Sequence, residues 1–528
     1  MEGAIAAWSA LLGADEVLTG PQAQARYGAD TGGATRTIPA ALRISDSATL
    51  PEVMRIAQRF RTPVHPISTG RNWGYGTALP PIDCCTIIDL SGLRRILHFD
   101  AELGVVTVEP GVTQGMLSEF LESGGHPYMV PTTGAGPTCS LVGNALERGY
   151  GITPITDHFA AVTDVEAVLA DGSLYQTALR EMGGEEVARL FKWGVGPYTA
   201  GLFTQSNIGI VTRLSIALAR RPDCVMTCLF SLADDKLLER AVTLTRHALA
   251  VLPGTVGGIN LMNRHRVLAM TAPYPVALDD AGLIPQAVIN TMGRQYQVAP
   301  WTGYATLYGT RRSVNTAARE LRSIFRGVSS RMIFFTPARA KALSRGVRLL
   351  PGAWGQRLAR TVDTLAQSLD LASGYPNETA LPLAYWRSGV RPSEGALDPA
   401  RDGCGILWFA PLVPMRGDSA RQLLLLVQEI TRAHGMEPLM TLTSLNDRVF
   451  DCTIPLLFDR LVPSQARSAR ACLDELIQRC SAQGFAPYRL DVESGRSISS
   501  HMQATKRFQD RLRSALDPDC LISPGRNG

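Results

Sequence analysis

The pattern of apolar and polar positions near the start of the chain predicts one β-α-β unit. Ala40–Ser45 is a short apolar run typical of a strand. Thr49–Phe60 then carries apolar residues at helical spacing, with Pro51 in the first turn, where proline is tolerated. A second strand is expected over Thr62–Ile67. The unit leads directly into 66–80, a loop rich in glycine, proline and polar residues.

Short elements continue to about residue 221. Alternating apolar residues around Asp171-Gly172 predict a β-hairpin over Thr163–Leu174, because this dipeptide favours a tight turn. The other expected elements are strands at Cys85–Leu90, Gly104–Glu109 and Gly209–Leu218 and a helix at Thr113–Ser123. The first part of the chain is therefore predicted to combine short strands with a few helices.

The pattern changes from about Arg221, where long helical patterns appear with strands between them. The change indicates a second domain, and the tail, 487–528, contains one more helical pattern. Residues 340–402 are rich in glycine, proline and arginine and give no assignment. The predicted helices are Asp235–Val251, Ser313–Arg326, Ser419–His434, Pro463–Gln483 and Ser497–Leu516, and the clearest strand is Gly405–Pro411.

Composition narrows the class of protein. A chain of 528 residues is too long for one ordinary core, so two or three domains are expected. The net charge of +5 comes without a basic block and gives no support for nucleic-acid binding. The ten cysteines form no CxxC pair and no zinc spacing, and they are expected to be reduced core residues. No apolar run is long enough for a membrane span, and no Lys or Arg precedes the first apolar run, so a cytoplasmic protein is expected.

Most common catalytic motifs are missing from the sequence. Gly134-Ala135-Gly136 is followed by Pro137, which would block the phosphate-binding turn of a nicotinamide Rossmann site. There is no GxxxxGK[ST], GxSxG or HExxH motif, and no metal site is expected. His158 is the one histidine beside a glycine-rich candidate site, and a single histidine more often makes a structural hydrogen bond than a catalytic one.

Two separate glycine-rich polar loops remain, 66–76 and 131–144, each preceded by a strand-like run. Glycine lets a backbone turn sharply and approach a ligand closely, and backbone N–H groups can hold an anion without a lysine. Two such loops could hold the two ends of an extended ligand with a pyrophosphate between them. The sequence therefore predicts a dinucleotide site.

These motifs resemble those of the vanillyl-alcohol oxidase and p-cresol methylhydroxylase family of FAD-linked oxidoreductases. The resemblance rests on PISTGRNWGYGTALP (66–80), VEPGVT (108–113), VGNALERGYGITPITDHF (142–159), VEAVLADGSL (165–174), SNIGIVTRL (206–214), PYRL (487–490) and LISPGRNG (521–528). The motifs follow the family's order and span nearly the whole chain, whereas residues 222–400 match only in their general pattern of helices and strands.

The resemblance implies an α+β fold. A two-subdomain FAD-binding domain of the PCMH type is expected over 1–221, a cap domain with a mainly antiparallel sheet flanked by helices over 222–484, and a C-terminal segment returning to the first domain over 485–528. The family's FAD contacts fall on Pro66, Ser68, Thr69, Gly70, Arg71, Asn72, Gly76, Pro131, Thr132, Thr133, Gly134, Ser140, Gly143, Asn144, Glu147, Arg148, Asp157, His158, Gly209, Ile210, Val211 and Arg526.

The family's 4-hydroxybenzyl branch holds a phenol oxygen with two tyrosines and an arginine, and the matching residues here are Tyr75, Tyr488 and Arg489. Two hydroxyl donors and a guanidinium lower the pKa of a bound phenol. The implied activity is removal of a hydride from the benzylic carbon of a para-substituted phenol, through a quinone methide. In the alternative, Tyr488 only packs and Arg489 pairs with the flavin. Tyr385, Trp386, Thr441 and Thr443 are candidates for lining the substrate pocket, although core packing explains these residues equally well.

The chain departs from the family at two places. The position where relatives attach FAD covalently corresponds to Ile406, which cannot form the bond, so non-covalent FAD is predicted. The loop 131–140 contains no Asp or Glu, where one oxidase of the family has an acidic residue near the flavin, so oxidase and dehydrogenase both stay open. The electron acceptor is then oxygen or a redox carrier protein, and a homodimer is expected from the family. The alternative substrates are a 2-hydroxy acid or a secondary-metabolite intermediate, and a non-catalytic flavin-binding protein is the third hypothesis.

Overall fold

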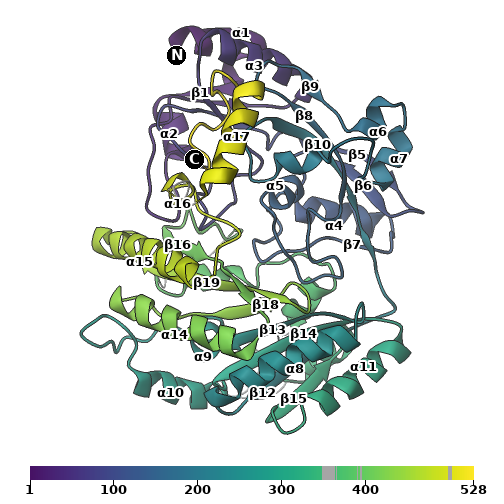
Figure 1. The fold of residues 1–528 in the computed structure, drawn as a ribbon, viewed down its shortest axis with the longest axis vertical. Helices are drawn as coiled ribbons and strands as arrows, with labels where there is room; N and C mark the ends of the chain where they lie inside the picture. The colour runs from purple at the N-terminus through teal and green to yellow at the C-terminus, as the bar shows by residue number, and fades with distance from the viewer. Residues whose placement is uncertain (348–362, 364–365, 389–390, 393–394, 498–501, 528) are drawn as a thin grey trace.

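The N-terminal part of the chain forms two small sheets and a two-stranded pair of β7 (Tyr128–Met129) with β11 (Ala219–Arg220) (Figure 1). The computed structural model describes residues 1–347, 363, 366–388, 391–392, 395–497 and 502–527. In the first sheet the order is β1 (Val17–Thr19), β2 (Ala40–Arg43), β4 (Thr86–Asp89) and β3 (Val64–Ile67). β2 and β3 run parallel to β4, since α3 (Leu50–Arg59) provides the crossover between β2 and β3. The predicted β-α-β unit is therefore present.

The second sheet is antiparallel and follows in the chain. Its order is β5 (Ile96–Asp100), β6 (Val105–Val108), β10 (Ile210–Ala217), β8 (Val162–Val168) and β9 (Leu174–Tyr175). The buried faces of β6, β8 and β10 pack on α4 (Gln114–Ser123) and α5 (Leu141–Leu146) in one apolar core. β8 and β9 form the predicted hairpin around Asp171-Gly172.

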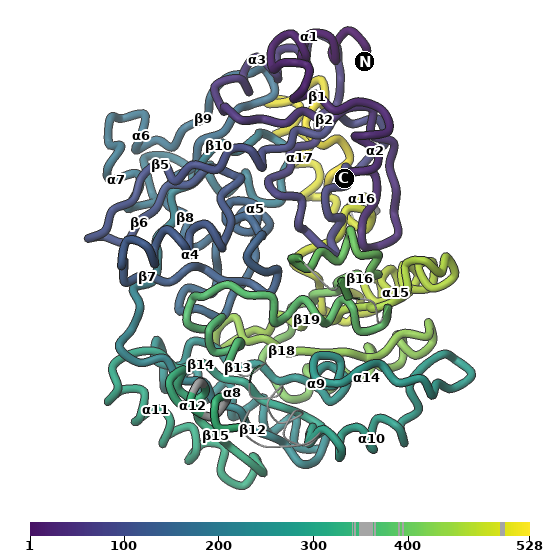
Figure 2. The backbone as a smooth tube through the Cα atoms, turned by 180° about the vertical axis from the view of Figure 1, so that it is seen from behind, coloured from purple at the N-terminus to yellow at the C-terminus, as the bar shows by residue number. Residues whose placement is uncertain are grey.

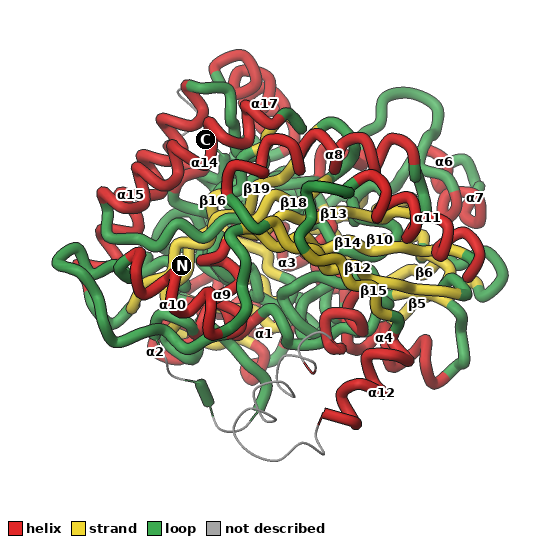
Figure 3. The backbone as a smooth tube through the Cα atoms, turned by 90° about the horizontal axis from the view of Figure 1, so that it is seen from below, coloured by secondary structure: helices red, strands yellow, loops and turns green. Residues whose placement is uncertain are grey.

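The cap sheet contains the later strands and is antiparallel throughout. Its order is β15 (Arg331–Phe335), β12 (Cys224–Leu232), β14 (Trp301–Gly309), β13 (Val256–Asn263), β18 (Thr441–Ser444), β19 (Val449–Asp459) and β16 (Cys404–Phe409), and β17 (Leu412–Pro414) also pairs with β19. Four amphipathic helices cover one face: α8 (Leu238–Val251), α11 (Arg311–Ile324), α14 (Gly417–Ala433) and α15 (Pro463–Ala482) (Figure 3). The opposite face carries the polar residues of the site described below. The predicted α+β class, with a mainly antiparallel cap sheet, is confirmed.

The C-terminal segment leaves the cap sheet and lies beside the N-terminal sheets (Figure 2). Ile522 pairs in parallel with Val64 of β3, and the backbone N–H of Val64 donates to the Leu521 carbonyl at 2.8 Å. Leu521 and Ile522 are buried in the core around the first sheet. Helix α17 (Gln503–Leu516) packs Leu512 and Leu516 on the core of the second sheet. The exact domain boundaries at 221 and 484 stay predictions.

Much of the sequence pattern is recovered with shifts of at most two residues, as for α3, α4, α11, α14 and α15, and α8 begins three residues later than predicted. All ten cysteines are free, and seven of them are buried. Parts of 340–402 lie outside the described residues. No helix in the described part of the chain is both long enough and apolar enough to cross a membrane.

Candidate functional site

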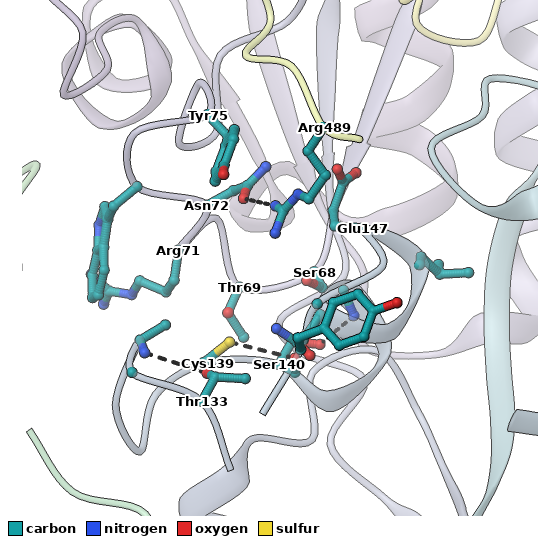
Figure 4. A pocket seen from close by; sticks show the side chains of 18 of the residues that line it. Ser68, Thr69, Arg71, Asn72, Tyr75, Thr133, Cys139, Ser140, Glu147 and Arg489 are labelled. Atoms are coloured by element: carbon teal, nitrogen blue, oxygen red, sulfur yellow. Dashed lines mark hydrogen bonds between the residues drawn. The ribbon is translucent and has the colours of Figure 1, made fainter. Parts of the chain in front are cut away.

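A cavity of about 480 Å³ lies between the N-terminal sheets and the polar face of the cap sheet. Its volume is in the range of small-molecule and cofactor sites, about 300–1,000 Å³. One wall consists of loops 66–77 and 132–152, a second of cap strands β13, β16, β18 and β19, and residues 488, 489 and 526 of the C-terminal segment close it. The cavity therefore collects all three parts of the chain. Figure 4 shows its loop wall with Arg489 of the C-terminal segment.

Most of the residues predicted from the resemblance line this one cavity. They are Pro66, Ser68, Thr69, Gly70, Arg71, Asn72, Tyr75, Thr132, Thr133, Gly134, Ser140, Gly143, Asn144, Glu147, Gly209, Val211, Tyr488, Arg489 and Arg526. The two glycine-rich loops are separated by about 60 residues in sequence, yet they touch. A Cβ built on Gly143 would lie 2.3 Å from Ser68 Oγ, so a larger residue there would force the Ser68 hydroxyl to rotate or the loops to move apart.

The loop after β3 presents hydrogen-bond donors that the described chain does not use. Within that part of the chain, no acceptor takes the backbone N–H groups of 68–71. Gly70 has a positive φ of 64°, which turns the loop sharply. Successive free N–H groups at such a turn bind anions, so the loop fits the pyrophosphate of a dinucleotide.

The second loop is held in place by its own side chains. Ser140 caps α5, because its hydroxyl accepts the Gly143 N–H at 2.9 Å and donates to the Pro110 carbonyl at 2.6 Å. Gln114 of α4 exchanges hydrogen bonds with Thr133, its amide oxygen accepting from the backbone at 2.9 Å and its amide donating to the hydroxyl at 2.8 Å. The loop wall is therefore fixed before any ligand binds.

Glu147 carries a partly buried negative charge at the end of α5. Arg526 forms an ion pair with it. Burial alone would raise the pKa of Glu147, but the guanidinium groups of Arg526 and Arg489 overcome this effect and hold the pKa below its usual value. The ion pair attaches the C-terminus to this wall, and Asn527 adds a hydrogen bond to the Gln205 carbonyl at 2.7 Å.

Arg489 lies between the two tyrosines of the predicted phenol site. Its Cζ atom is 4.1 Å from the centroid of the Tyr75 ring, and its Nη2 atom donates to Asn72 Oδ1 at 3.0 Å. Tyr488 interacts with the same guanidinium and stacks edge-on against Tyr150, with the ring centroids 5.8 Å apart. Burial raises the pKa of Tyr75 and that of Tyr488, so both hydroxyls stay protonated donors at neutral pH.

Several predicted residues do not line the cavity. Tyr385 and Trp386 are corrected from pocket residues to core residues: the Tyr385 hydroxyl donates to Asp402 Oδ2 at 2.5 Å, and Trp386 Nε1 donates to the Ala272 carbonyl at 2.9 Å. Their neighbours Leu383 and Ala384 face the cavity instead. Core packing, the alternative given above, therefore explains this pair.

The remaining predicted residues outside the cavity support its walls or the adjoining cores. Arg148 donates to Thr204 Oγ1, His158 Nδ1 lies 2.5 Å from Asn144 Oδ1, and Asp157 accepts the Ala160 N–H at 3.0 Å. The others are placed by packing, by a single contact or by their position in the chain: Gly76 against Val492, Ile210 in the core around the first sheet, Pro131 as the first residue of the second loop, and Thr441 as an acceptor for Arg266.

Sequence reasoning missed two charged residues of the cap that line the cavity, Asp451 and Arg266. Asp451 is 4% exposed, its Oδ1 atom has no partner in the described structure, and burial raises its pKa to about 7 against the opposing effect of Arg489. A signal was present, because Asp451 is a lone carboxylate in the otherwise apolar strand pattern 449–458. Arg266 carries no such signal, since arginine is ordinary in a short surface helix.

The chain is similar to known proteins along nearly its whole length. Residues 38–178 match the family model described as FAD binding domain. The chain is 33% identical over 530 residues to 1'-carboxy-chondrochloren decarboxylase of Chondromyces crocatus, covering 100% of this chain and 97% of that protein. It is 27% identical over 483 residues to the 4-cresol dehydrogenase [hydroxylating] flavoprotein subunit of Pseudomonas putida, covering 90% and 85%. The crystal structure of p-cresol methylhydroxylase with substrate bound matches with a TM-score of 0.87 at 25% identity, covering 100% and 96%.

Fold and cavity define a flavoprotein with a cap over its cofactor loops. The chain belongs to the vanillyl-alcohol oxidase and p-cresol methylhydroxylase family of FAD-linked oxidoreductases. It is an FAD-dependent enzyme, and the donors of 68–71 and the two glycine-rich loops fit this cofactor.

Proposed function

We propose that the enzyme oxidises a para-substituted phenol at its benzylic carbon. The observation that carries the proposal is that Tyr75, Tyr488 and Arg489 meet in the cavity, with Arg489 in contact with both tyrosines. Two protonated hydroxyls and one guanidinium suit the oxygen of a phenolate, because all three favour its charged form. FAD, when bound, supplies the acceptor for the hydride that leaves the benzylic carbon.

The polar residues of the site divide into two tasks. Loop 66–76, apart from Tyr75, and loop 131–144 hold the cofactor, whereas Tyr75, Tyr488 and Arg489 hold the phenol oxygen. Phenolate donates electrons through the ring to the para position, and this weakens the benzylic C–H bond toward hydride loss. A quinone methide results, which water or loss of a second group converts to product.

Asp451 takes the phenol proton in this proposal. Its carboxyl lies close enough to Tyr75, Tyr150 and Tyr488 to raise their pKa values. The charge of Arg489 in turn lowers the pKa of Asp451, against the larger effect of burial. A carboxyl with a pKa of about 7 is well matched to accept a proton near neutral pH. The electron acceptor, oxygen or a carrier protein, and a homodimeric state stay expectations from the family.

Anaerobic flavin reduction tests the proposal. 4-Ethylphenol is expected to bleach the flavin, whereas its methyl ether, which cannot ionise, is expected to fail. Tyr75→Phe and Tyr488→Phe should each slow reduction by 4-ethylphenol about tenfold or more, because each removes one donor to the phenolate. Equal reduction by phenol and ether, or unchanged rates in both variants, would contradict the phenol assignment.

A further inference from the structure

Arg266 places a second positive charge in the cavity, on the cap side. It lies on α9 (Arg264–Thr271), and the Asn263 side chain fixes the first turn by accepting the Arg266 backbone N–H at 3.0 Å. Its Nε atom donates to Thr441 Oγ1 at 3.2 Å, and its Cζ atom lies 6.0 Å from the centroid of the Trp408 ring. The guanidinium is thus held in position by the cap alone.

The charge of Arg266 has no counter-ion among the described residues. Two other arginines that line the cavity do have counter-ions: Arg71 of loop 66–76 pairs with Asp398, and Arg526 pairs with Glu147. Arg266 forms no ion pair in the described structure, its Nη1 atom is buried without a hydrogen-bond partner, and burial lowers its pKa to about 10. A buried charge without a partner is costly, so this arrangement points to an anionic ligand.

The neighbours of Arg266 connect it to the proposed phenol site in two ways. Trp408, under the guanidinium, donates its backbone N–H to the Gly74 carbonyl at 3.3 Å, and Gly74 precedes Tyr75. On the cap sheet, Thr441 lies two residues before Thr443, which is paired with Asp451. Two residues along a strand span about 7 Å. Thr441, which Arg266 contacts, is therefore about 7 Å along β18 from the residue that pairs with Asp451, a distance that a short substrate side chain can span.

We propose that the substrate carries a carboxylate on the side chain para to its phenol and that Arg266 binds this carboxylate. The inference rests on the proposed function, since it names the substrate class for the same site. Guanidinium and carboxylate form a bidentate, charge-assisted pair, which a cavity of low dielectric strengthens. The name of the C. crocatus relative, a decarboxylase of a carboxy compound, is consistent with a carboxylated substrate.

A carboxylate on the carbon next to the benzylic position gives a balanced route to product. Loss of a hydride from the benzylic carbon of the phenolate, with the flavin as two-electron oxidant, leaves a quinone methide carboxylate. The C–CO₂ bond then breaks, and its electron pair forms the side-chain double bond and restores the phenolate. The products are a 4-alkenylphenol, CO₂ and the reduced flavin, and the hydride accounts for both electrons.

The test compares 3-(4-hydroxyphenyl)propanoate with its neutral isostere 3-(4-hydroxyphenyl)propanamide on the FAD-loaded enzyme. Kd and anaerobic flavin reduction are measured for both. With carboxyl-labelled acid, labelled CO₂ and 4-vinylphenol are expected in amounts equal to the reduced flavin. The acid is expected to bind about 30-fold or more tightly than the amide, as for a desolvated charge pair.

Arg266→Met is expected to remove this preference, raising the Kd of the acid about 30-fold or more while the Kd of the amide stays within about threefold. Arg266→Lys should retain part of the preference, because it keeps the charge without the planar fork. Arg264→Met, on the same helix but outside the cavity lining, is the matched control and should leave both Kd values unchanged. FAD affinity, measured separately, should be equal in all four proteins.

Three outcomes overturn the inference: equal binding of acid and amide in the unmodified enzyme, flavin reduction by the acid without labelled CO₂, or an FAD affinity that falls in Arg266→Met. The last outcome would assign Arg266 to the cofactor. Failure of the proposed function is distinguishable, because then neither compound, nor 4-ethylphenol, reduces the flavin.

Discussion

The guanidinium of Arg489 lies over the ring of Tyr75, with its Cζ atom 4.1 Å from the ring centroid. Tyr75 belongs to the loop that follows β3, whereas Arg489 comes from the C-terminal segment. The same guanidinium donates to Asn72 Oδ1 at 3.0 Å, so it contacts the loop at two points. One side chain thereby sets the spacing between the cofactor loop and the proposed phenol site.

Arg489→Met is predicted to slow flavin reduction by 4-ethylphenol about 100- to 1,000-fold, because it removes the positive charge that favours phenolate. The variant also removes one of the two cations beside Glu147, so FAD content must be checked by absorbance. Arg479→Met, on the exposed side of α15, is the control and should keep the rate of the unmodified enzyme. A rate in Arg489→Met within threefold of that value would contradict the assigned role.

The sequence predicted the cofactor half of the site better than the substrate half. Loops 66–76 and 131–144 were predicted from their glycine and polar residues, because the residue types that a sharply turning loop requires can be recognised in the sequence of the loop itself. Tyr75, Tyr488 and Arg489 could be paired only through the family resemblance, because Tyr75 lies 413 positions before Tyr488 in the sequence. Their proximity in the cavity depends on the return of the chain to β3.

Residues of the cap were harder to predict for a physical reason. In β18 and β19 alternate residues face the cavity or the helix-covered core, so pocket and core residues share one strand pattern. Tyr385 and Trp386 lie outside these strands and were mispredicted for another reason. Large aromatic residues suit a pocket, yet their polar atoms form hydrogen bonds to Asp402 and Ala272 within the core. Arg266 was missed because its lack of a partner appears only in three dimensions.

The pH dependence of flavin reduction is predicted to reflect Asp451. The carboxyl accepts a proton only when ionised, and its pKa is raised to about 7, so the rate constant should rise as pH increases through about 7 and then level off. Arg489, Tyr75, Tyr150 and Tyr488 face it, and all three tyrosines stay protonated in this window because burial raises their pKa values.

Asp451→Asn should abolish this rise and lower the plateau about 100-fold, which stopped-flow measurements between pH 5.5 and 8.5 would show. The substitution keeps the shape of the side chain, so folding is little affected. A variant that retains the same rise near pH 7 would assign the titration to another group.

The close approach of the two glycine-rich loops is predicted to control FAD affinity. In Gly143→Ala the added Cβ would lie 2.3 Å from Ser68 Oγ, so the Ser68 hydroxyl must rotate or the loops must separate. Overpacking of this kind costs about 1–3 kcal/mol, so FAD affinity should fall roughly 5- to 100-fold in equilibrium titrations. Ser68→Ala in the same chain should restore part of the loss, because it removes the clashing oxygen.

Gly346→Ala is the matched control for this substitution. Gly346 is exposed on α12 (Pro337–Val347), and none of the described residues lies within 4 Å of the position of its Cβ. The control should bind FAD as the unmodified chain does. Equal affinity in Gly143→Ala and Gly346→Ala would show that the cofactor does not depend on this contact.

The flavin is predicted to leave the protein on denaturation. Ile406 lines the cavity on β16, and its hydrocarbon side chain offers no nucleophile to the cofactor. After acid precipitation the flavin absorbance should therefore appear in the supernatant. Yellow precipitate, with flavin that co-migrates with the chain in denaturing electrophoresis, would contradict the prediction.

Glu437 is predicted to make the stability of the cap depend on pH. Its Oε1 atom accepts the Ile284 N–H at 2.7 Å, and burial raises its pKa from the usual 4.5 to about 7, against the effects of that hydrogen bond and of Arg387. A carboxyl whose pKa is raised by folding stabilises the folded state fully below the unfolded value, near 4.5. This contribution is lost as pH rises through about 7. His265, 3.9 Å away, stays neutral over this window because burial lowers its pKa to about 4.

Glu437→Gln keeps an acceptor for Ile284 and does not titrate. The free energy of unfolding of the variant, relative to that of the unmodified chain, should therefore rise by about 3 kcal/mol between pH 4.5 and pH 8. Urea unfolding at several pH values measures the difference. Glu320→Gln, on the exposed face of α11, controls for the removal of one acidic residue. A difference for Glu437→Gln that stays constant from pH 4.5 to 8 would show that Glu437 is ionised in the folded cap throughout, with its charge compensated by Arg387 and Arg432.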